Sequence, residues 1–187
     1  LARFAESLIP IINDNKDKAI EMATECINNF ANIYQKYWLE MMRKKLGLLG
    51  KEIKDEGLIV ELLSWMHKNN ADYTNTFCFL MNEKIKNDEV YNNKDFINWK
   101  KQWQERLKLH SNSPKKYLEI MRSNNPLVIP RNHKVEEALD AANKNDLNPM
   151  KKLLKVLEKP YQKQETTNNY QAPAPITNEK YRTFCGT

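Results

Sequence analysis

The sequence predicts an all-α protein, an irregular array of about seven helices that ends in an extended C-terminal tail. Only four of the 187 residues are glycine, whereas folds rich in strands and turns normally contain more. Apolar residues recur every three or four positions, which is the period of an amphipathic helix. This period stops near position 160, and the later Ala172-Pro173-Ala174-Pro175 favours extended chain. We therefore expect a helical region over residues 1–160 and a Pro-containing tail over residues 161–187.

The first predicted helix, residues 16–45, has the longest apolar face in the chain. Asn13 or Asp14 is placed to cap its start, and Leu46-Gly47 ends it, since glycine readily adopts the left-handed backbone that follows a helix. Cys26 lies on an apolar face, so we expect it to be buried as a small hydrophobe. The residues that repeat at helical spacing are Ile20, Ala23, Ile27, Phe30, Tyr34, Tyr37 or Trp38, and Met41.

Two shorter helices are predicted next. Residues 55–68 form an amphipathic stretch that ends at Asn69-Asn70, and His67 falls at its exposed C-terminal end, where a cation suits the helix dipole. Another helix opens near Asp72, with Asp72 and Thr74 as competing caps. Polar groups at a helix start can also bind an anion, and that alternative stays open for this segment.

Four further helices follow. Over residues 94–109, Trp99 and Trp103 share one face with Lys and Arg opposite, and core packing is the expected role of both rings. If exposed, the rings would instead form a stacking platform for nucleic-acid bases. The other three helices are predicted from Ser113-Pro114 onward, over residues 133–143, and over residues 150–158 after the Asn148-Pro149 start signal.

Asn125-Pro126 interrupts the helical pattern, because the residue before a proline is pushed toward extended backbone. A short apolar run follows and ends at a second proline, Pro130. Arg131, Asn132 and His133 come next, where the following helix begins. The stretch predicts a rigid extended connector that delivers three polar side chains to a helix start. Taken alone, it defines a shape and no reaction.

The net charge of +6 is unevenly distributed along the chain. Residues 97–163 hold 15 Lys/Arg against 7 Asp/Glu, whereas residues 1–96 hold 13 against 15. A basic half can bind nucleic acid, but most of these lysines sit between apolar helical positions, as on any solvated helix face. No apolar run approaches the ~20 residues that span a bilayer. We therefore expect neither a nucleic-acid partner nor a membrane partner.

No motif for catalysis or for cofactor binding is found. The sequence lacks GxxxxGK[ST], GxGxxG and the catalytic-loop and DFG motifs of kinases. Its three cysteines have neither zinc-site nor disulfide-framework spacing, which favours a reducing compartment. Cys78 follows Phe77 in an apolar cluster, so we expect it to be buried. We assign no catalytic, cofactor-binding or metal-binding residue to this chain.

Short segments along the chain nevertheless occur in a recognisable order. They are Leu8-Ile9-Pro10, Tyr37-Trp38, Met42-Arg43-Lys44-Lys45-Leu46-Gly47-Leu48, Ala71-Asp72-Tyr73-Thr74-Asn75-Thr76-Phe77, Trp99-Lys100-Lys101-Gln102-Trp103, Arg106-Leu107, Met121-Arg122, Asn125-Pro126, Arg131-Asn132, Glu136-Glu137-Ala138-Leu139-Asp140-Ala141-Ala142, Leu153-Leu154, Pro160-Tyr161 and Phe184-Cys185-Gly186-Thr187. In this order they resemble the C-terminal part of the selenoprotein O (YdiU) family, which comprises pseudokinase-fold protein adenylyltransferases.

The resemblance implies that the full-length protein transfers AMP from ATP to Ser, Thr or Tyr hydroxyls of other proteins, with Mg²⁺ or Mn²⁺. It also implies that the nucleotide-binding, metal-binding and catalytic residues precede this chain, whose first residue is Leu rather than Met. We therefore expect an inactive piece of a longer protein, whose partner is the missing N-terminal kinase-like body and whose helices extend its helical lobe. A bacterial member would be cytoplasmic and a eukaryotic member mitochondrial.

Within that family order, Pro126, Pro130, Arg131 and Asn132 are interpreted as a structural connector, with Arg131 and Asn132 holding backbone groups of the connector or of the lobe. Members of the family commonly end with a cysteine or selenocysteine near the C-terminus, and Cys185 occupies that position. In the family this residue can pair with a cysteine of the catalytic body, which implies redox control. An unpaired tail thiol without a role is the alternative.

The alternative for the whole chain comes from a different class of function. A stand-alone helical interaction module would bind an acidic protein or a nucleic acid through the basic residues 97–163. Such a module would require no catalytic body upstream.

Overall fold

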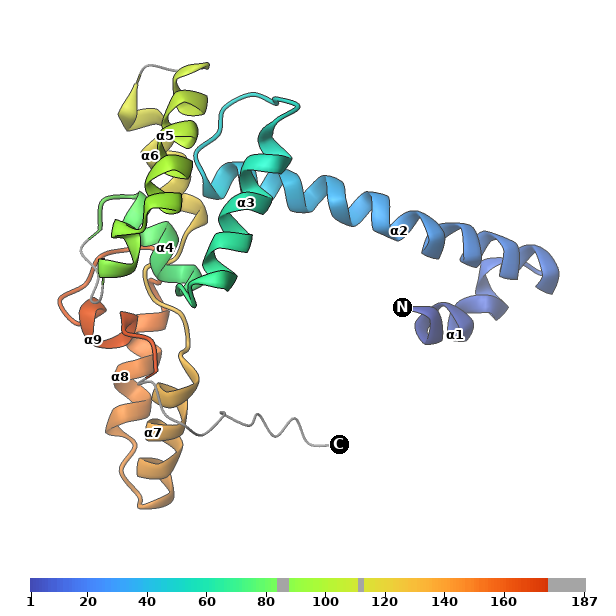
Figure 1. The fold of residues 1–187 in the computed structure, drawn as a ribbon. Helices are drawn as coiled ribbons and strands as arrows, with labels where there is room; N and C mark the ends of the chain where they lie inside the picture. The colour runs from blue at the N-terminus through green and yellow to red at the C-terminus, as the bar shows by residue number, and fades with distance from the viewer. Residues whose placement is uncertain (84–87, 111–112, 175–187) are drawn as a thin grey trace. The chain divides into compact units, whose positions relative to one another are not determined.

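A computed structural model describes residues 1–83, 88–110 and 113–174 (Figure 1). Within these ranges all regular structure is helical, as predicted, and comprises nine α-helices and one 3-10 helix. The chain divides into two compact units, residues 1–43 and residues 44–187. None of the helices in the described ranges is long and apolar enough to cross a membrane.

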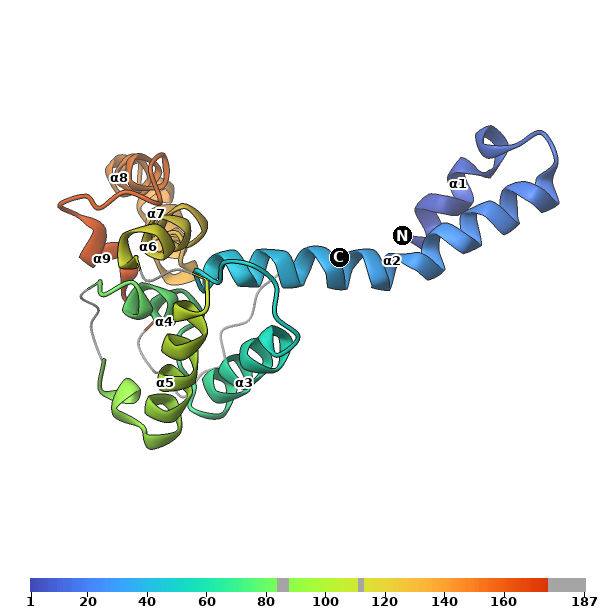
Figure 2. The same ribbon diagram turned by 90° about the horizontal axis from the view of Figure 1, so that it is seen from above.

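Residues 1–43 contain α1 (Ala2–Ile12) and most of α2 (Lys16–Lys45). Helix α2 has the predicted bounds. Helix α1 was not predicted, and Pro10 lies inside it, although proline usually interrupts a helix. Figures 1 and 2 show α1 folded back along the first half of α2.

The start of α2 is capped by a residue that was not predicted. The side-chain oxygen of Asn15 accepts hydrogen bonds from the backbone N–H groups of Asp17 and Lys18, at 3.0 and 3.1 Å. Asn15 therefore caps the helix in place of Asn13 or Asp14, because its carbonyl satisfies two of the amides that have no partner within the first turn.

Between residues 16 and 41, Ala19 and Ala23 are the only buried residues. The large apolar side chains that repeat along α2 are mostly exposed. The prediction that Cys26 is buried is wrong, since its side chain lies exposed on this uncovered part of α2.

The unit that begins at residue 44 contains the other helices. They are α3 (Asp55–Lys68), α4 (Tyr73–Leu80), the 3-10 helix η1 (Asp88–Asn92), α5 (Lys94–Lys108), α6 (Pro114–Asn124), α7 (Asn132–Asn143), α8 (Asn148–Leu157) and α9 (Thr167–Gln171). Helices α3 to α8 correspond to the six predicted here. In Figure 2, α3 and α5 lie side by side.

The core of this unit is built around two tryptophans of α5. Trp99 and Trp103 are almost completely buried, and their rings stack with centroids 6.1 Å apart. The indole N–H of Trp99 donates to the carbonyl of Leu58 at 2.8 Å, and that of Trp103 donates to the carbonyl of Leu46 at 2.9 Å. Buried indoles need such acceptors. The core role predicted for both rings is confirmed, and burial excludes a base-stacking platform.

Helix α9 lies inside the region predicted to be an extended tail. Thr167 and Gln171 are buried, and the hydroxyl of Thr167 accepts a hydrogen bond from the backbone N–H of Gln164 at 2.8 Å. The chain after α8 therefore folds back onto the body at least as far as Gln171. Cys185 lies outside the described residues.

Candidate functional site

The connector between α6 and α7 is the feature that the sequence singled out, and both of its ends are fixed by hydrogen bonds. At its start, the amide of the buried Asn125 donates to the carbonyls of Lys45 and Met121, at 2.8 and 2.9 Å. The backbone N–H groups of Leu127 and Val128 both donate to the carbonyl of Pro160. The extended segment is thus held to the ends of α2, α6 and α8.

At the other end, Arg131 forms a bidentate ion pair with Asp72. Its two terminal nitrogens donate to the two carboxylate oxygens, at 2.5 and 2.9 Å. Asp72 is also the N-cap of α4, where its side chain accepts a hydrogen bond from the backbone N–H of Asn75 at 2.8 Å. The Asp72 carboxylate therefore both caps α4 and pairs with the guanidinium of Arg131, which lies 59 residues later in the sequence.

The same guanidinium reaches α9. Arg131 donates to the backbone carbonyl of Gln171 at 3.0 Å, and the side-chain amide of Asn75 donates to that carbonyl at 3.2 Å. The side-chain amide of Gln171 lies 3.7 Å from the sulfur of Cys78, which in turn lies 3.7 Å from the carbonyl oxygen of Pro126. These contacts join the connector, α4 and α9 in one partly buried polar cluster, which we call the Arg131 cluster.

The ionisation of the Arg131 cluster follows from these contacts. Burial raises the pKa of the Asp72 carboxyl, but the hydrogen bonds from Arg131 and from the backbone of Asn75 and Thr74 outweigh it, so the pKa lies below its ordinary value. Burial raises the pKa of the Cys78 thiol to about 11. At neutral pH, Asp72 is therefore ionised and Cys78 is protonated. A buried, protonated thiol is a poor nucleophile.

The predicted site residues are not brought together as a reactive group. Pro126 and Arg131 are partly buried in the Arg131 cluster, whereas Pro130 and Asn132 are exposed. In the part of the chain that the structure describes, the Asn132 side chain makes no hydrogen bond, and Arg131 alone holds a backbone group. Asp72 also places a negative charge at the start of α4, which opposes the anion-binding alternative for that segment.

A second arginine–carboxylate pair lies between α3 and α5. Arg106 Nε donates to one oxygen of Asp55 at 2.6 Å, and Nη2 donates to the other at 3.2 Å and to the carbonyl of Leu49 at 3.0 Å. The Asp55 side chain is 0% exposed and that of Arg106 is 7% exposed. The sequence had placed the basic residues of this helix opposite its tryptophans. Arg106 is instead buried, because it follows Trp103 by three positions and shares its face.

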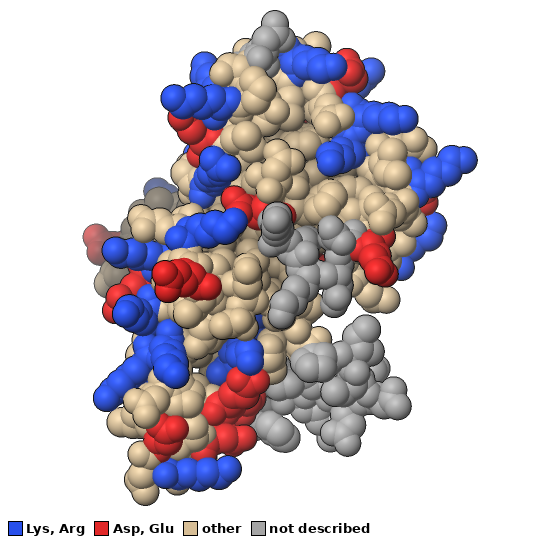
Figure 3. All heavy atoms as spheres, turned by 90° about the vertical axis from the view of Figure 1, so that its left-hand side faces the viewer, with Lys and Arg blue, Asp and Glu red and all other residues tan. Residues whose placement is uncertain are grey.

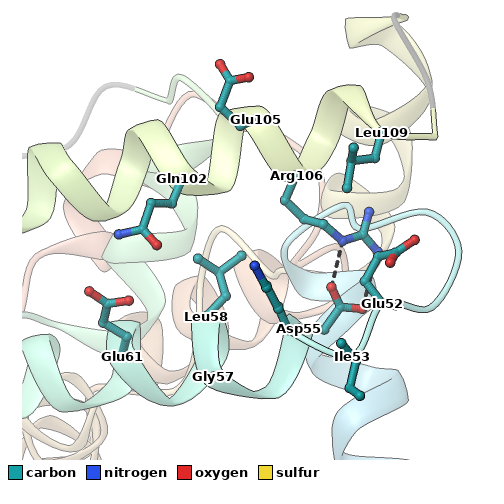
Figure 4. Close-up of a pocket in the computed structure, with 11 residues that line it drawn as sticks. Glu52, Ile53, Asp55, Gly57, Leu58, Glu61, Gln102, Glu105, Arg106 and Leu109 are labelled. Atoms are coloured by element: carbon teal, nitrogen blue, oxygen red, sulfur yellow. Dashed lines mark hydrogen bonds and ion pairs between the residues drawn. The ribbon is translucent and has the colours of Figure 1, made fainter.

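A surface hollow of about 690 Å³ opens beside this pair (Figure 4). Glu61 of α3 and Gln102 of α5 point toward each other across it, while Glu105 projects away. Glu52 closes one end, where one of its carboxylate oxygens lies 2.7 Å from Nε2 of His110. Asp55 balances the charge of Arg106, and the other charged lining residues are Lys54 and the three glutamates Glu52, Glu61 and Glu105. The lining is therefore acidic on balance, which disfavours a nucleotide phosphate.

The described residues contain no group of three or more His, Cys, Asp or Glu side chains placed to hold a metal ion. The buried Arg106 and the partly buried Arg131 are each paired with a carboxylate. The geometry of the described region thus supports a structural role for its most buried charged groups.

The model of the family described as protein adenylyltransferase SelO matches residues 1–158. The chain belongs to the SelO family. Three curated relatives are named protein nucleotidyltransferase YdiU: the protein of Pelagibacter ubique is 53% identical over the whole chain, and those of Alcanivorax borkumensis and Bacillus cereus (strain ATCC 14579) are 45% and 46% identical. The resemblance read from the sequence is confirmed.

The chain spans about two-fifths of the length of these relatives, covering 39%, 39% and 38% of them. It corresponds to the C-terminal portion of the longer SelO-family proteins. The Arg131 cluster, the Asp55–Arg106 pair and both tryptophans of α5 all lie within residues 1–158 or contact them.

Proposed function

We propose that this chain is the non-catalytic C-terminal helical region of a SelO-family protein adenylyltransferase. The observation that carries the proposal is the family match over residues 1–158, on a body in which Arg106 and Arg131 are each paired with a carboxylate. In this proposal, Arg106 and Arg131 hold helices together. The region supports a catalytic body that is supplied by the rest of the protein.

In the proposed reaction of the full-length enzyme, a Ser, Thr or Tyr hydroxyl oxygen of a protein substrate attacks the α-phosphorus of ATP. A phosphodiester bond forms, pyrophosphate leaves, and the hydroxyl proton passes to a base. Mg²⁺ or Mn²⁺ bound to ATP would offset the charge of the phosphates. The described residues do not fit the ATP phosphates, because the hollow beside Arg106 is acidic and Arg106 and Arg131 are each paired with a carboxylate. They also contain no group of three or more His, Cys, Asp or Glu side chains placed to hold the metal ion. We assign ATP, metal and catalysis to the N-terminal part.

The role that we propose for the connector is to fix the last helices on the preceding ones. Through Arg131 and Asn125 the connector is hydrogen-bonded to α4, α6 and α9. Helices α7 and α8, which pack as a pair, follow it directly. In this proposal, the polar residues of the connector hold helices together and take no part in catalysis.

An adenylylation assay tests this division of roles. Full-length protein is incubated with α-³²P-ATP and MgCl₂ or MnCl₂, and label transferred to the protein itself or to a protein mixture is counted. We expect transfer by the full-length protein and none by residues 1–187. Transfer by residues 1–187 alone would show that the catalytic residues lie in this chain, and the proposal would be abandoned.

Redox regulation through Cys185 is the second part of the proposal. Its thiol would form a disulfide with a cysteine of the N-terminal body, releasing two protons and two electrons to a low-molecular-weight disulfide, which is reduced to two thiols. Cys78 is unsuited as the partner, because it is buried with a raised pKa. Full-length protein and its Cys185→Ser variant are compared on a non-reducing gel after treatment with oxidised glutathione. Equal mobility of the two would exclude the disulfide.

The alternative of a stand-alone nucleic-acid-binding module is less well supported. On the face shown in Figure 3, Lys and Arg are interspersed with Asp and Glu instead of forming one continuous basic stripe. Nucleic-acid binding depends steeply on salt concentration. Binding of residues 1–187 to an oligonucleotide that weakens by orders of magnitude between about 50 and 200 mM salt would restore this alternative.

A further inference from the structure

Helix α2 has a long apolar face that the described residues leave uncovered. Along it, apolar positions alternate at spacings of three and four residues, which is the pattern of a helix that packs against another helix. Yet Phe30 is 45% exposed, Tyr34 57% and Tyr37 61%. Ile20 and Met41, near the two ends of the face, are also exposed.

Helix α1 extends this surface. A hollow of about 340 Å³ lies between α1 and the first half of α2, and every residue that lines it has an apolar or thiol side chain. Phe4 and Leu8 line it from α1, and Met22, Cys26 and Phe30 line it from α2. Phe4, Met22 and Phe30 are themselves exposed. We call the exposed apolar side chains of α1 and α2 the α1–α2 face.

Such a surface is costly in water. Exposed apolar area is unfavourable in proportion to its size, and large contiguous apolar patches on soluble proteins mark interaction sites. Helices also gain most of their stability from packing an amphipathic face. In residues 1–43 that packing is slight, because α1 covers only part of the α2 face and the buried side chains between residues 16 and 41 are two alanines.

We propose that the α1–α2 face is the docking surface for the N-terminal part of the same protein, the three-fifths of the SelO-family chain that precedes these residues. This chain covers 39% of the Pelagibacter ubique relative and corresponds to its C-terminal portion, so the N-terminal part would join this chain at the start of α1. An intramolecular partner is favoured because it is present at high effective concentration. This inference rests on the proposed function only in that both require an N-terminal body.

Cys26 provides a reporter for the docking. It is exposed and lines the hollow, whereas Cys78 is buried and serves as the unreactive control. The rate of alkylation of Cys26 by iodoacetamide is measured by peptide mass spectrometry in native full-length protein carrying Cys185→Ser. The same measurement is made on residues 1–187 with that substitution, and on full-length protein in urea.

We expect Cys26 to react at least about tenfold more slowly in native full-length protein than in residues 1–187 or in urea, because docking excludes the reagent from the hollow. Equal rates in native full-length protein and residues 1–187, both close to the rate in urea, would overturn the proposal. Slow reaction in residues 1–187 at every protein concentration would also overturn it, since the face would then be covered from within this chain. Protection in residues 1–187 that grows with protein concentration would identify a second copy as the occupant instead.

A pair of variants of the full-length protein makes the test specific. Phe30→Asp places a charge in the α1–α2 face, and Asn28→Asp places the same charge on an exposed position of α2 away from that face. Phe30→Asp should raise the rate of Cys26 alkylation toward the rate measured in residues 1–187, and Asn28→Asp should leave the rate unchanged. No change in either variant would count against docking at this face.

The adenylylation assay separates this inference from the proposed function. Protection of Cys26 without transfer of AMP would support the docking surface and refute the enzyme assignment. Transfer of AMP by full-length protein in which Cys26 reacts as fast as in residues 1–187 would support the enzyme and refute the docking surface.

Discussion

The two arginine–carboxylate pairs of this chain have the same chemistry but different surroundings. Asp55 and Arg106 join two packed helices, and their side chains are 0% and 7% exposed. Asp72 and Arg131 join a connector to a helix start, and they are 21% and 11% exposed. In the first pair, removal of one side chain leaves the opposite charge in the core without its counter-ion. In the second, water can reach the remaining charge, so the cost of a broken pair should fall with exposure.

The largest effect is expected at the fully buried pair. Arg106→Met should destabilise residues 44–174 by about 3–5 kcal/mol, because the buried carboxylate of Asp55 loses the cation that balances its charge. Urea unfolding followed by tryptophan fluorescence measures this, since three of the four tryptophans lie in this unit. The double variant Asp55→Leu/Arg106→Met is the matched control and should recover most of the loss. A single variant as stable as the unmodified chain would show that the pair is not formed.

A smaller loss is expected at the connector. Arg131→Met should cost about 2–3 kcal/mol, less than Arg106→Met, because Asp72 is partly exposed and keeps its hydrogen bond to the backbone of Asn75. The same unfolding experiment compares the two variants directly. A larger loss of unfolding free energy for Arg131→Met than for Arg106→Met would show that solvent exposure does not determine the cost of breaking these pairs.

The charge of Asp72 can be removed while its cap is kept. Asp72→Asn should cost about 1–2 kcal/mol at pH 7, because asparagine still caps the helix but no longer pairs with Arg131. Since the pKa of Asp72 is lowered in the folded protein, the stabilisation is complete above its ordinary pKa of 3.8 and is lost as pH falls through the lower folded value. The stability difference between the two proteins, measured by urea unfolding at pH 7 and pH 3, should therefore shrink in acid. A constant difference would exclude the ionised pair as its source.

The smallest effect is expected at the shared acceptor. Asn75→Ala removes one of two donors to the carbonyl of Gln171 and should cost about 1 kcal/mol, because Arg131 still satisfies that oxygen. Combined with Arg131→Met, the loss should exceed the sum of the two single losses, since the buried carbonyl then has neither donor. A double-mutant cycle in the same urea assay measures this coupling. Losses of unfolding free energy that simply add would show that Asn75 and Arg131 do not share the carbonyl of Gln171 as an acceptor.

Local sequence signals were sufficient for most of the helices. Periodic apolar residues and cap-then-proline starts predict α2, α3 and α5 to α8 to within a few residues, because these signals act within one turn. The same signals miss α9, which has no apolar period. Its residue Gln171 meets Asn75 and Arg131, which lie 96 and 40 residues away in the sequence.

The candidate site shows the same limit. Arg131 and Asp72 were each singled out from the sequence, one in the connector and the other as a helix cap, but no pattern links them across 59 residues. The burial of Arg106 could have been inferred from its spacing to Trp103, and its partner Asp55 could not. For α2 the apolar period predicted a packed face, whereas most of its large apolar side chains are exposed in the described residues.

The contact at Gln171 has a practical consequence for where this chain can be cut. Arg131 and Asn75 donate to its backbone carbonyl, so a substitution at Gln171 keeps these two hydrogen bonds and loses only the side-chain contact with the sulfur of Cys78. Removal of the residue loses all three contacts. Shortened versions that keep residue 171 should express as stable proteins, whereas those ending before it should unfold more readily or be degraded. We therefore expect the minimal stable chain to extend past residue 158, where the family match ends, as far as residue 171.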